Sequence, residues 1–142
     1  MATFDGFFTG ECDALETYLK TKYTTAGEVF QGHKVIGTFK FPGYAITLGT
    51  SQRDPKSKFG WVMTIDVTYV QQSGRKLPPD VWDEAEVLMD HIKDHWTARN
   101  VSDNDMHGIV DAINPRSVNI PKMGYVNWFK ITSKVYKLTD EG

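Results

Sequence analysis

Two histidines, His91 and His95, stand four residues apart in a stretch with helical periodicity, and they are the sequence's best candidates for metal ligands. At this spacing two imidazoles on one helix can bind the same metal ion. The zincin pattern also requires a glutamate directly after the first histidine as general base, but Ile92 occupies that position. His33 and His107 are the only other histidines, and the chain has one cysteine. We therefore interpret the pair as residues at the edge of a buried helix face and expect no metal site.

Other patterns that could support catalysis are incomplete. Asp103 and Asp105, with an asparagine between them, resemble the start of a calcium-binding loop, but the glycine and the terminal glutamate that such a loop needs are missing. We interpret this segment as a solvated turn. Neither the Walker spacing nor a Gly-x-Gly-x-x-Gly loop occurs, and no serine lies in a nucleophile elbow. We expect no catalytic residue, no cofactor and no enzyme activity.

Basic residues gather in two predicted loops. Arg53, Lys56 and Lys58 lie in the first, and Arg75 and Lys76 lie in the second. If the strands on either side of the first loop form a hairpin, the two loops flank the second of these strands at its opposite ends. Two interpretations stay open: ordinary solubilising charge, or contact with an acidic partner surface. We do not expect direct, sequence-specific nucleic-acid binding, because the net charge is −2 and such affinity rests on clustered Lys and Arg.

A long amphipathic helix, predicted from Pro79 to Arg99, organises the elements that position these residues. Its polar face carries mainly acidic side chains, so one side should be buried and the other should face water. Prolines precede it, and proline is tolerated in the first turn of a helix. The apolar residues that recur at helical steps are Trp82, Ala85, Leu88, Met89, Ile92 and Trp96.

The remaining periodicity predicts one more helix and several strands. The N-terminal helix should cover Glu11 to Lys22, with Cys12 on its apolar side. The expected strands are Glu28–Gln31, Val35–Phe39, Tyr44–Gly49, Trp61–Val70, Ile109–Ile113, Val118–Ile120 and Tyr125–Leu138, with polar loops at Thr50–Phe59 and Gln71–Leu77. The sequence therefore predicts a single α+β domain over residues 1–142: a mostly antiparallel sheet with the two helices packed on it. We expect a core of Leu15, Leu19, Ile46, Met63, Ile65, Val67, Leu88, Ile92 and Ile131.

The environment of the protein can also be predicted. A single cysteine cannot form an intramolecular disulfide, which favours a reducing compartment. No stretch is apolar enough for a membrane span, and the N-terminus lacks a basic region followed by an apolar one. We expect a soluble, unprocessed cytosolic protein that does not contact membranes.

The order of these elements resembles that of the tail terminator and tail completion proteins of long-tailed bacteriophages. The likeness extends from about residue 5 to residue 138 and rests on element order, not on a diagnostic motif. It comprises the N-terminal helix, a strand entered through Phe41-Pro42, the charged arm from Gly49 to Gly60, the strand Gly60–Val67, the Pro-started helix and two closing strands that include Trp128–Thr132.

The resemblance implies a structural virion protein located in the tail and assembled in the host cytoplasm. Family members form a ring, usually a hexamer, that caps the last ring of tail-tube protein and joins it to the head or neck. Its partners would be other copies of itself, the tube protein and a head or neck protein. Arg53, Lys56, Lys58, Arg75 and Lys76 would then be interaction residues. Two alternatives stay open: a head-completion or other head-tail connector, and a small ligand-binding α+β domain or enzyme.

Overall fold

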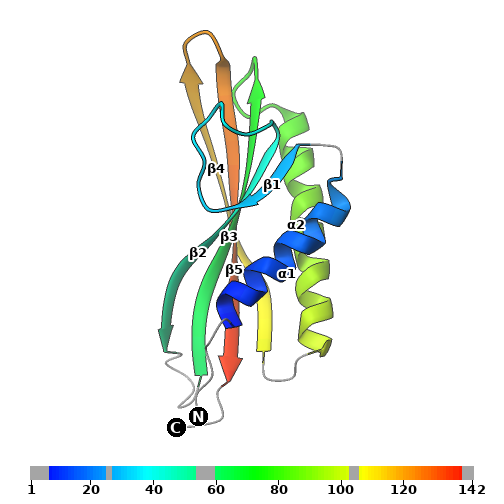
Figure 1. Cartoon of the computed structure of the whole chain (residues 1–142). Coiled ribbons are helices and arrows are strands. Elements are labelled where there is room, and N and C mark those ends of the chain that lie inside the picture. The colour runs from blue at the N-terminus through cyan, green and yellow to red at the C-terminus, as the bar shows by residue number, and fades with distance from the viewer. Residues whose placement is uncertain (1–6, 25–26, 54–59, 103–105, 139–142) are drawn as a thin grey trace.

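Two helices and a five-stranded sheet make up the described part of the chain (Figure 1). The computed structural model describes residues 7–24, 27–53, 60–102 and 106–138. The fold is α+β, as the sequence predicted. No helix in these ranges is long and apolar enough to cross a membrane. The elements are α1 (Phe7–Lys22), β1 (Glu28–Gln31), β2 (Gly43–Arg53), β3 (Gly60–Ser73), α2 (Pro79–Ser102), β4 (Met106–Ile120) and β5 (Gly124–Leu138).

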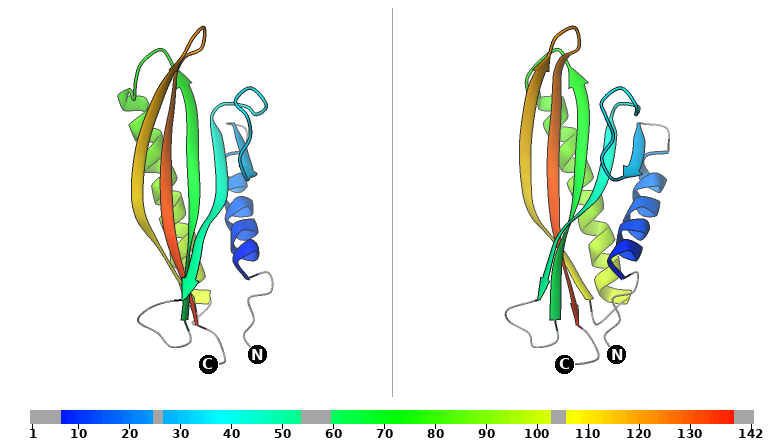
Figure 2. Two further views of the ribbon diagram at one scale, coloured as in Figure 1. Left: turned by 90° about the vertical axis from the view of Figure 1, so that its left-hand side faces the viewer. Right: turned by 60° about the vertical axis from the view of Figure 1, so that its left-hand side comes forward.

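The strands follow the order β1-β2-β3-β5-β4 across the sheet. The β1 strand pairs in parallel with the start of β2, and every other neighbouring pair is antiparallel. The edge formed by β1 is four residues long, whereas the opposite edge is the 15-residue β4. Both helices lie against one face of the sheet (Figure 2). The other face, called the open face below, carries no helix.

The core lies between the helices and the sheet because strand side chains alternate between its two faces. Met63, Ile65, Val67 and Tyr69 of β3 point to the helices, and each is at most 3% exposed. All nine side chains predicted to form the core are buried to the same degree or more. The predicted stripe of α2 is correct except at its start. Trp82 is 40% exposed, and Val81, one residue earlier, is buried instead.

Trp82 was misplaced because a tryptophan at a helical step looks like a core residue. Its ring lies at the flank of the helix, edge-on to Phe129 at a centroid distance of 4.6 Å. A large aromatic ring can cover apolar surface from the rim of a core while much of it stays in water.

The segment Val35–Phe39, predicted as a strand, forms a turn. The Thr38 amide donates to the Val35 carbonyl oxygen at 3.0 Å, and Gly37 has a φ of 99°. A positive φ suits glycine and reverses the chain direction, so the apolar residues around it belong to a loop. We call residues 32–42 the crossover loop, since they connect the parallel strands β1 and β2.

The strands β2 and β3 are longer than predicted. The β2 strand continues to Arg53 and β3 begins at Gly60, so the loop predicted at Thr50–Phe59 contains strand at its start. A register shift between Leu48 and Ser51 lets β2 pass its glycine and pair again. At its other end β3 extends to Ser73.

The two fragments predicted at Ile109–Ile113 and Val118–Ile120 are parts of one strand, β4. Pro115 does not interrupt β4, because β4 is an edge strand that pairs with β5. On its other side the described ranges contain no strand to which the missing N–H of proline would have donated.

The end of α2 is fastened to the sheet at β4 and β5. The Trp96 indole N–H donates to Ser133 Oγ at 2.9 Å inside the core. The Asn100 side chain accepts from the Gly108 amide at 2.7 Å and donates to the Gly108 carbonyl at 3.0 Å. Position 108 requires glycine, because a Cβ there would lie 2.6 Å from the Trp96 ring.

Candidate functional site

The two histidines of α2 pack against aromatic rings. His95 is 5% exposed, and its ring centroid lies 4.8 Å from Trp96 and 5.2 Å from Tyr18. His91 meets Tyr23 edge-on at 5.7 Å. Burial lowers the pKa of His95 to about 4, opposed by nearby Glu11. The imidazole is therefore neutral at pH 7, and its Nε2 has no hydrogen-bond partner in the described part of the chain.

No group of three or more His, Cys, Asp or Glu side chains in the described ranges is arranged to hold a metal ion. Asp103 and Asp105 lie outside these ranges. Burial, with help from the carboxylates of Asp13 and Glu11, raises the pKa of the Cys12 thiol to about 12, so the thiol stays protonated and is a poor nucleophile.

A buried ion pair joins the two helices. Glu11 is 4% exposed and accepts from the Arg99 guanidinium through both carboxylate oxygens, one at 2.9 Å from Nε. The two-point geometry fixes the start of α1 against the last turn of α2. This ion pair connects the two helices of the layer. It does not involve the outer side of α2.

The predicted basic residues lie at two ends of the sheet. Arg75 and Lys76 are exposed between β3 and α2, whereas the backbone of Arg53 ends β2 beside the start of β3. Lys56 and Lys58 lie outside the described residues. The structure therefore separates Arg53 from Arg75 and Lys76 by the length of β3, as the sequence predicted for a hairpin.

Lys122 was missed by the sequence reasoning and joins the Arg75 end. It is exposed in the turn between β4 and β5, with a φ of 70°. The Gln72 side chain donates to the Met123 carbonyl at 2.6 Å, which fastens this turn to the end of β3. We call Arg75, Lys76 and Lys122 the basic end. The short Pro-Lys-Met-Gly run between two strands was the signal that could have revealed it.

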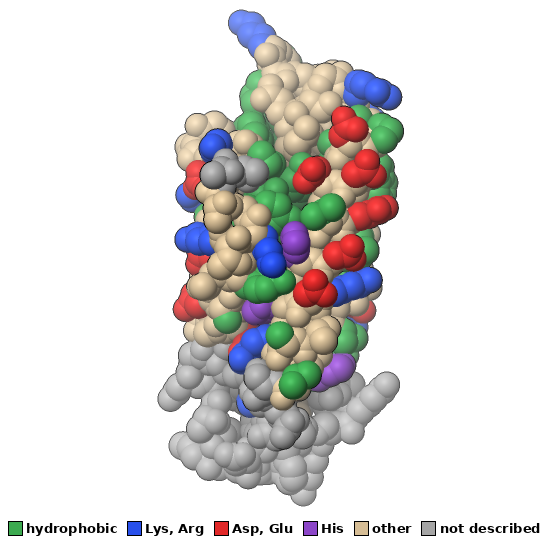
Figure 3. Space-filling model, turned by 90° about the vertical axis from the view of Figure 1, so that its right-hand side faces the viewer, with side chains coloured by type: hydrophobic (Ala, Val, Ile, Leu, Met, Phe, Trp, Pro, Cys, Tyr) green, Lys and Arg blue, Asp and Glu red, His purple; other side chains and the backbone are tan. Residues whose placement is uncertain are grey.

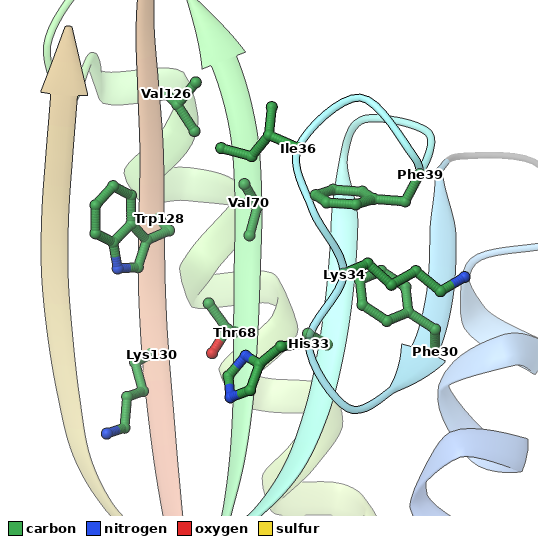
Figure 4. Close-up of a pocket in the computed structure, with 11 residues that line it drawn as sticks. Phe30, His33, Lys34, Ile36, Phe39, Thr68, Val70, Val126, Trp128 and Lys130 are labelled. Carbon is green, nitrogen blue, oxygen red and sulfur yellow. The ribbon is translucent and has the colours of Figure 1, made fainter. Parts of the chain in front are cut away.

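The open face of the sheet carries an apolar groove of about 330 Å³ beside the crossover loop (Figure 4). One wall comes from β3 and β5, and the other comes from the crossover loop together with Phe30 of β1 and Ala45 of β2. Phe30, Ile36, Phe39, Val70, Val126 and Trp128 supply its apolar lining, with His33 and Lys130 among the polar residues. The apolar residues Val126 and Trp128 on the second face of β5 are the sequence signal for this groove.

The crossover loop is held in place by hydrogen bonds and aromatic contacts. Both Lys34 Nζ and the Lys40 amide donate to the Glu28 carboxylate, at 2.6 and 3.2 Å. The Phe39 ring lies 5.1 Å from Phe30. Lys34 also covers the Phe30 ring at 4.7 Å, and its ammonium group points away from Trp128 (Figure 4). The wall of the groove is thus a built feature with its own internal bonds.

The outer face of α2 is acidic. Between Asp80 and Asp94 the helix carries six acidic residues and one lysine. Acidic side chains form a column along this helix, with hydrophobic atoms between them (Figure 3). None of the six carboxylates makes an ion pair with another residue in the part of the chain that the structure describes. Val87 lies in this face and is 46% exposed.

No protein-family model matches this chain, and a search of curated proteins finds no match.

Proposed function

We propose that this chain is a ring-forming subunit of a bacteriophage tail, similar to a tail terminator, that caps the tail tube and joins it to the head or neck. The observation that carries the proposal is that the chain has basic residues at both ends of one long sheet. Arg53 ends β2 at one end, and Arg75 and Lys76 lie at the other. A protein that joins two different assemblies needs two such separate contact surfaces.

The dimensions of the sheet support this role. The 14-residue β3 strand spans roughly 45 Å, since a strand rises about 3.3 Å per residue. Charges this far apart cannot serve one small binding site, and at physiological salt they do not influence each other. Each end can contact its own partner.

The order of elements supports the proposal as well. An N-terminal helix, a hairpin with charged residues at its connection, a long helix and a closing hairpin were the basis of the resemblance, and these elements are α1, β2–β3, α2 and β4–β5. A ring subunit needs no catalytic group. It needs two different surfaces for its neighbours, because a cyclic assembly with more than two members is built from heterologous contacts.

The test combines electron microscopy with a binding assay. Rings should be visible in the purified protein, six-fold if the family pattern holds, and they should bind tail tubes that lack a terminator. Replacing the basic residues by Arg75→Glu and Lys76→Glu should leave the rings intact and weaken capture of one partner by about tenfold or more, most strongly at low salt. A protein that stays monomeric at every concentration would overturn the proposal. Rings that bind only a portal-side protein would favour a head-completion role.

A further inference from the structure

We propose that the outer face of α2 on one subunit docks into the open-face groove of the next subunit, so that the partner of both surfaces is a second copy of this chain. The inference rests on the proposed ring function and names the contact that builds the ring. Two observations carry it: the two surfaces have complementary chemistry, and they lie on opposite sides of the molecule.

The helix offers an apolar side chain surrounded by carboxylates. Val87 is flanked on the same face by Asp83, four residues before it, and by Asp90, three residues after it. Residues at these spacings are neighbours on a helix surface. An exposed apolar residue among acids that make no ion pair within the described ranges is suited to a partner with an apolar hollow and a basic rim.

The groove offers this combination. Trp128 and the crossover loop form its apolar walls, and its lining contains no acidic residue. Lys130 lies two residues beyond Trp128 on the same strand face, and its side chain is 49% exposed although it pairs with Asp66 at 3.6 Å. Arg116 is opposite Trp128 in the register of β4 and β5, so it lies on the open face as well, and it is exposed.

The positions of the two surfaces determine the type of assembly. The α2 helix covers one face of the sheet and the groove lies on the other (Figure 2, Figure 4). In a two-fold dimer, the α2 face and the groove of each subunit would both have to lie in the same interface, which is impossible for patches on opposite sides of a subunit. They form a heterologous contact that repeats from subunit to subunit and closes into a ring when the rotation allows it.

A charge exchange tests the contact. The groove variant carries Arg116→Glu and Lys130→Glu, and the helix variant carries Asp83→Lys and Asp90→Lys. Each variant alone places like charges across the contact, so its self-association, measured by sedimentation velocity, should weaken by more than about tenfold. Circular dichroism should show both proteins folded. If the groove variant unfolds because of Asp66, His33→Glu with Arg116→Glu replaces it and leaves the Lys130 pair intact.

Mixing the two variants gives the decisive result. The basic helix of one protein then faces the acidic groove of the other, and the acidic helix of the second faces the basic groove of the first. An equimolar mixture should therefore assemble although neither component does. Its rings alternate between the two proteins and contain an even number of subunits, which a hexamer satisfies.

The matched control is the protein with Arg75→Glu and Lys76→Glu, which has the same change in net charge as the groove variant outside both surfaces. It should assemble like the parent. If the parent forms rings and the groove and helix variants form them equally well, this inference is wrong and the proposed function stands. If the mixture of variants fails to assemble, the contact uses other surfaces. If the parent forms no ring, the proposed function itself fails.

Discussion

Ile92 is fully buried in the centre of α2, and its removal should be costly. Ile92→Ala leaves a cavity in the hydrophobic core and should lower the free energy of unfolding by about 2 to 5 kcal/mol. Val87→Ala on the exposed side of the same helix should change it by less than about 0.5 kcal/mol. Urea denaturation of both proteins measures the difference. Equal values would mean that the buried face of α2 is assigned wrongly.

His95 should make stability depend on pH. Burial lowers its pKa to about 4 in the folded protein, whereas an unfolded histidine titrates near 6.5. Between these values the unfolded chain binds a proton that the folded chain does not. The contribution of His95 to the free energy of unfolding is therefore fully present above pH 6.5 and falls as the pH drops towards 4. His95→Phe keeps an aromatic ring between Tyr18 and Trp96 and should flatten this part of the profile.

The control is His107→Phe, since His107 is exposed. Urea midpoints at pH 7 and pH 5 give the comparison. A His95→Phe protein with the same loss between the two pH values as the parent would show that another group causes the dependence.

At the scale of single residues, the sequence predicted burial well where a position has one plausible environment. Leu88 and Ile92 lie in the middle of the apolar stripe, so no other face was available to them. Trp82 lies at the edge of that stripe, and its large ring fits either side of the boundary. The pairing of Glu11 with Arg99 joins residues 88 positions apart, and no local pattern contains that information.

Among the elements, the junction of α2 and β4 permits a sharp test. Gly108→Ala places a Cβ against the Trp96 ring, which is itself fixed by its bond to Ser133. Overpacking of this kind should cost about 1 to 3 kcal/mol. Gly74→Ala is the control, because its added Cβ meets no atom within 4 Å. Thermal melting compares the two, and a Gly108→Ala protein as stable as the control would show that β4 can shift away from the helix.

The element types were predicted more accurately than their ends. A local pattern locates α2 and β3 because their periodicity is long and regular. It missed the continuity of β4, since whether proline is tolerated depends on the position of the strand in the sheet. It also predicted a strand at Val35–Phe39 within the crossover loop, where apolar residues cover the open face. Both errors depend on neighbours that only the folded chain supplies.

For the whole molecule, the two basic regions should act independently. Reversing Arg53, Lys56 and Lys58 to Glu should leave the protein folded and weaken assembly or the capture of one partner, with the largest effect at low salt. The Arg75→Glu and Lys76→Glu protein should retain that capture and lose the other. Pull-down assays with tail tubes and with neck proteins separate the two effects. If both variants lost the same partner to the same extent, the two ends would not be separate contact surfaces.

The architecture could be predicted from the sequence, but the relation between its surfaces could not. Acidic residues on one side of α2 were visible as a helical pattern. The groove requires segments that are distant in the chain, namely β1, the crossover loop, β2, β3 and β5, and its position opposite α2 follows from the sheet that separates them. Binding surfaces formed in this way depend on tertiary packing, which local periodicity does not record.

The proline in β4 has a consequence for the protein at high concentration. A bare 15-residue edge strand is a template on which further strands can grow into amyloid-like fibrils. Prolines in edge strands are found with the nitrogen turned away from the paired neighbour, so an arriving strand would lack a donor at Pro115. We expect Pro115→Thr to shorten the lag time of fibril growth followed by thioflavin T fluorescence, while Pro121→Thr in the adjacent turn should not. An unchanged lag time for Pro115→Thr would mean that β4 is protected by other means.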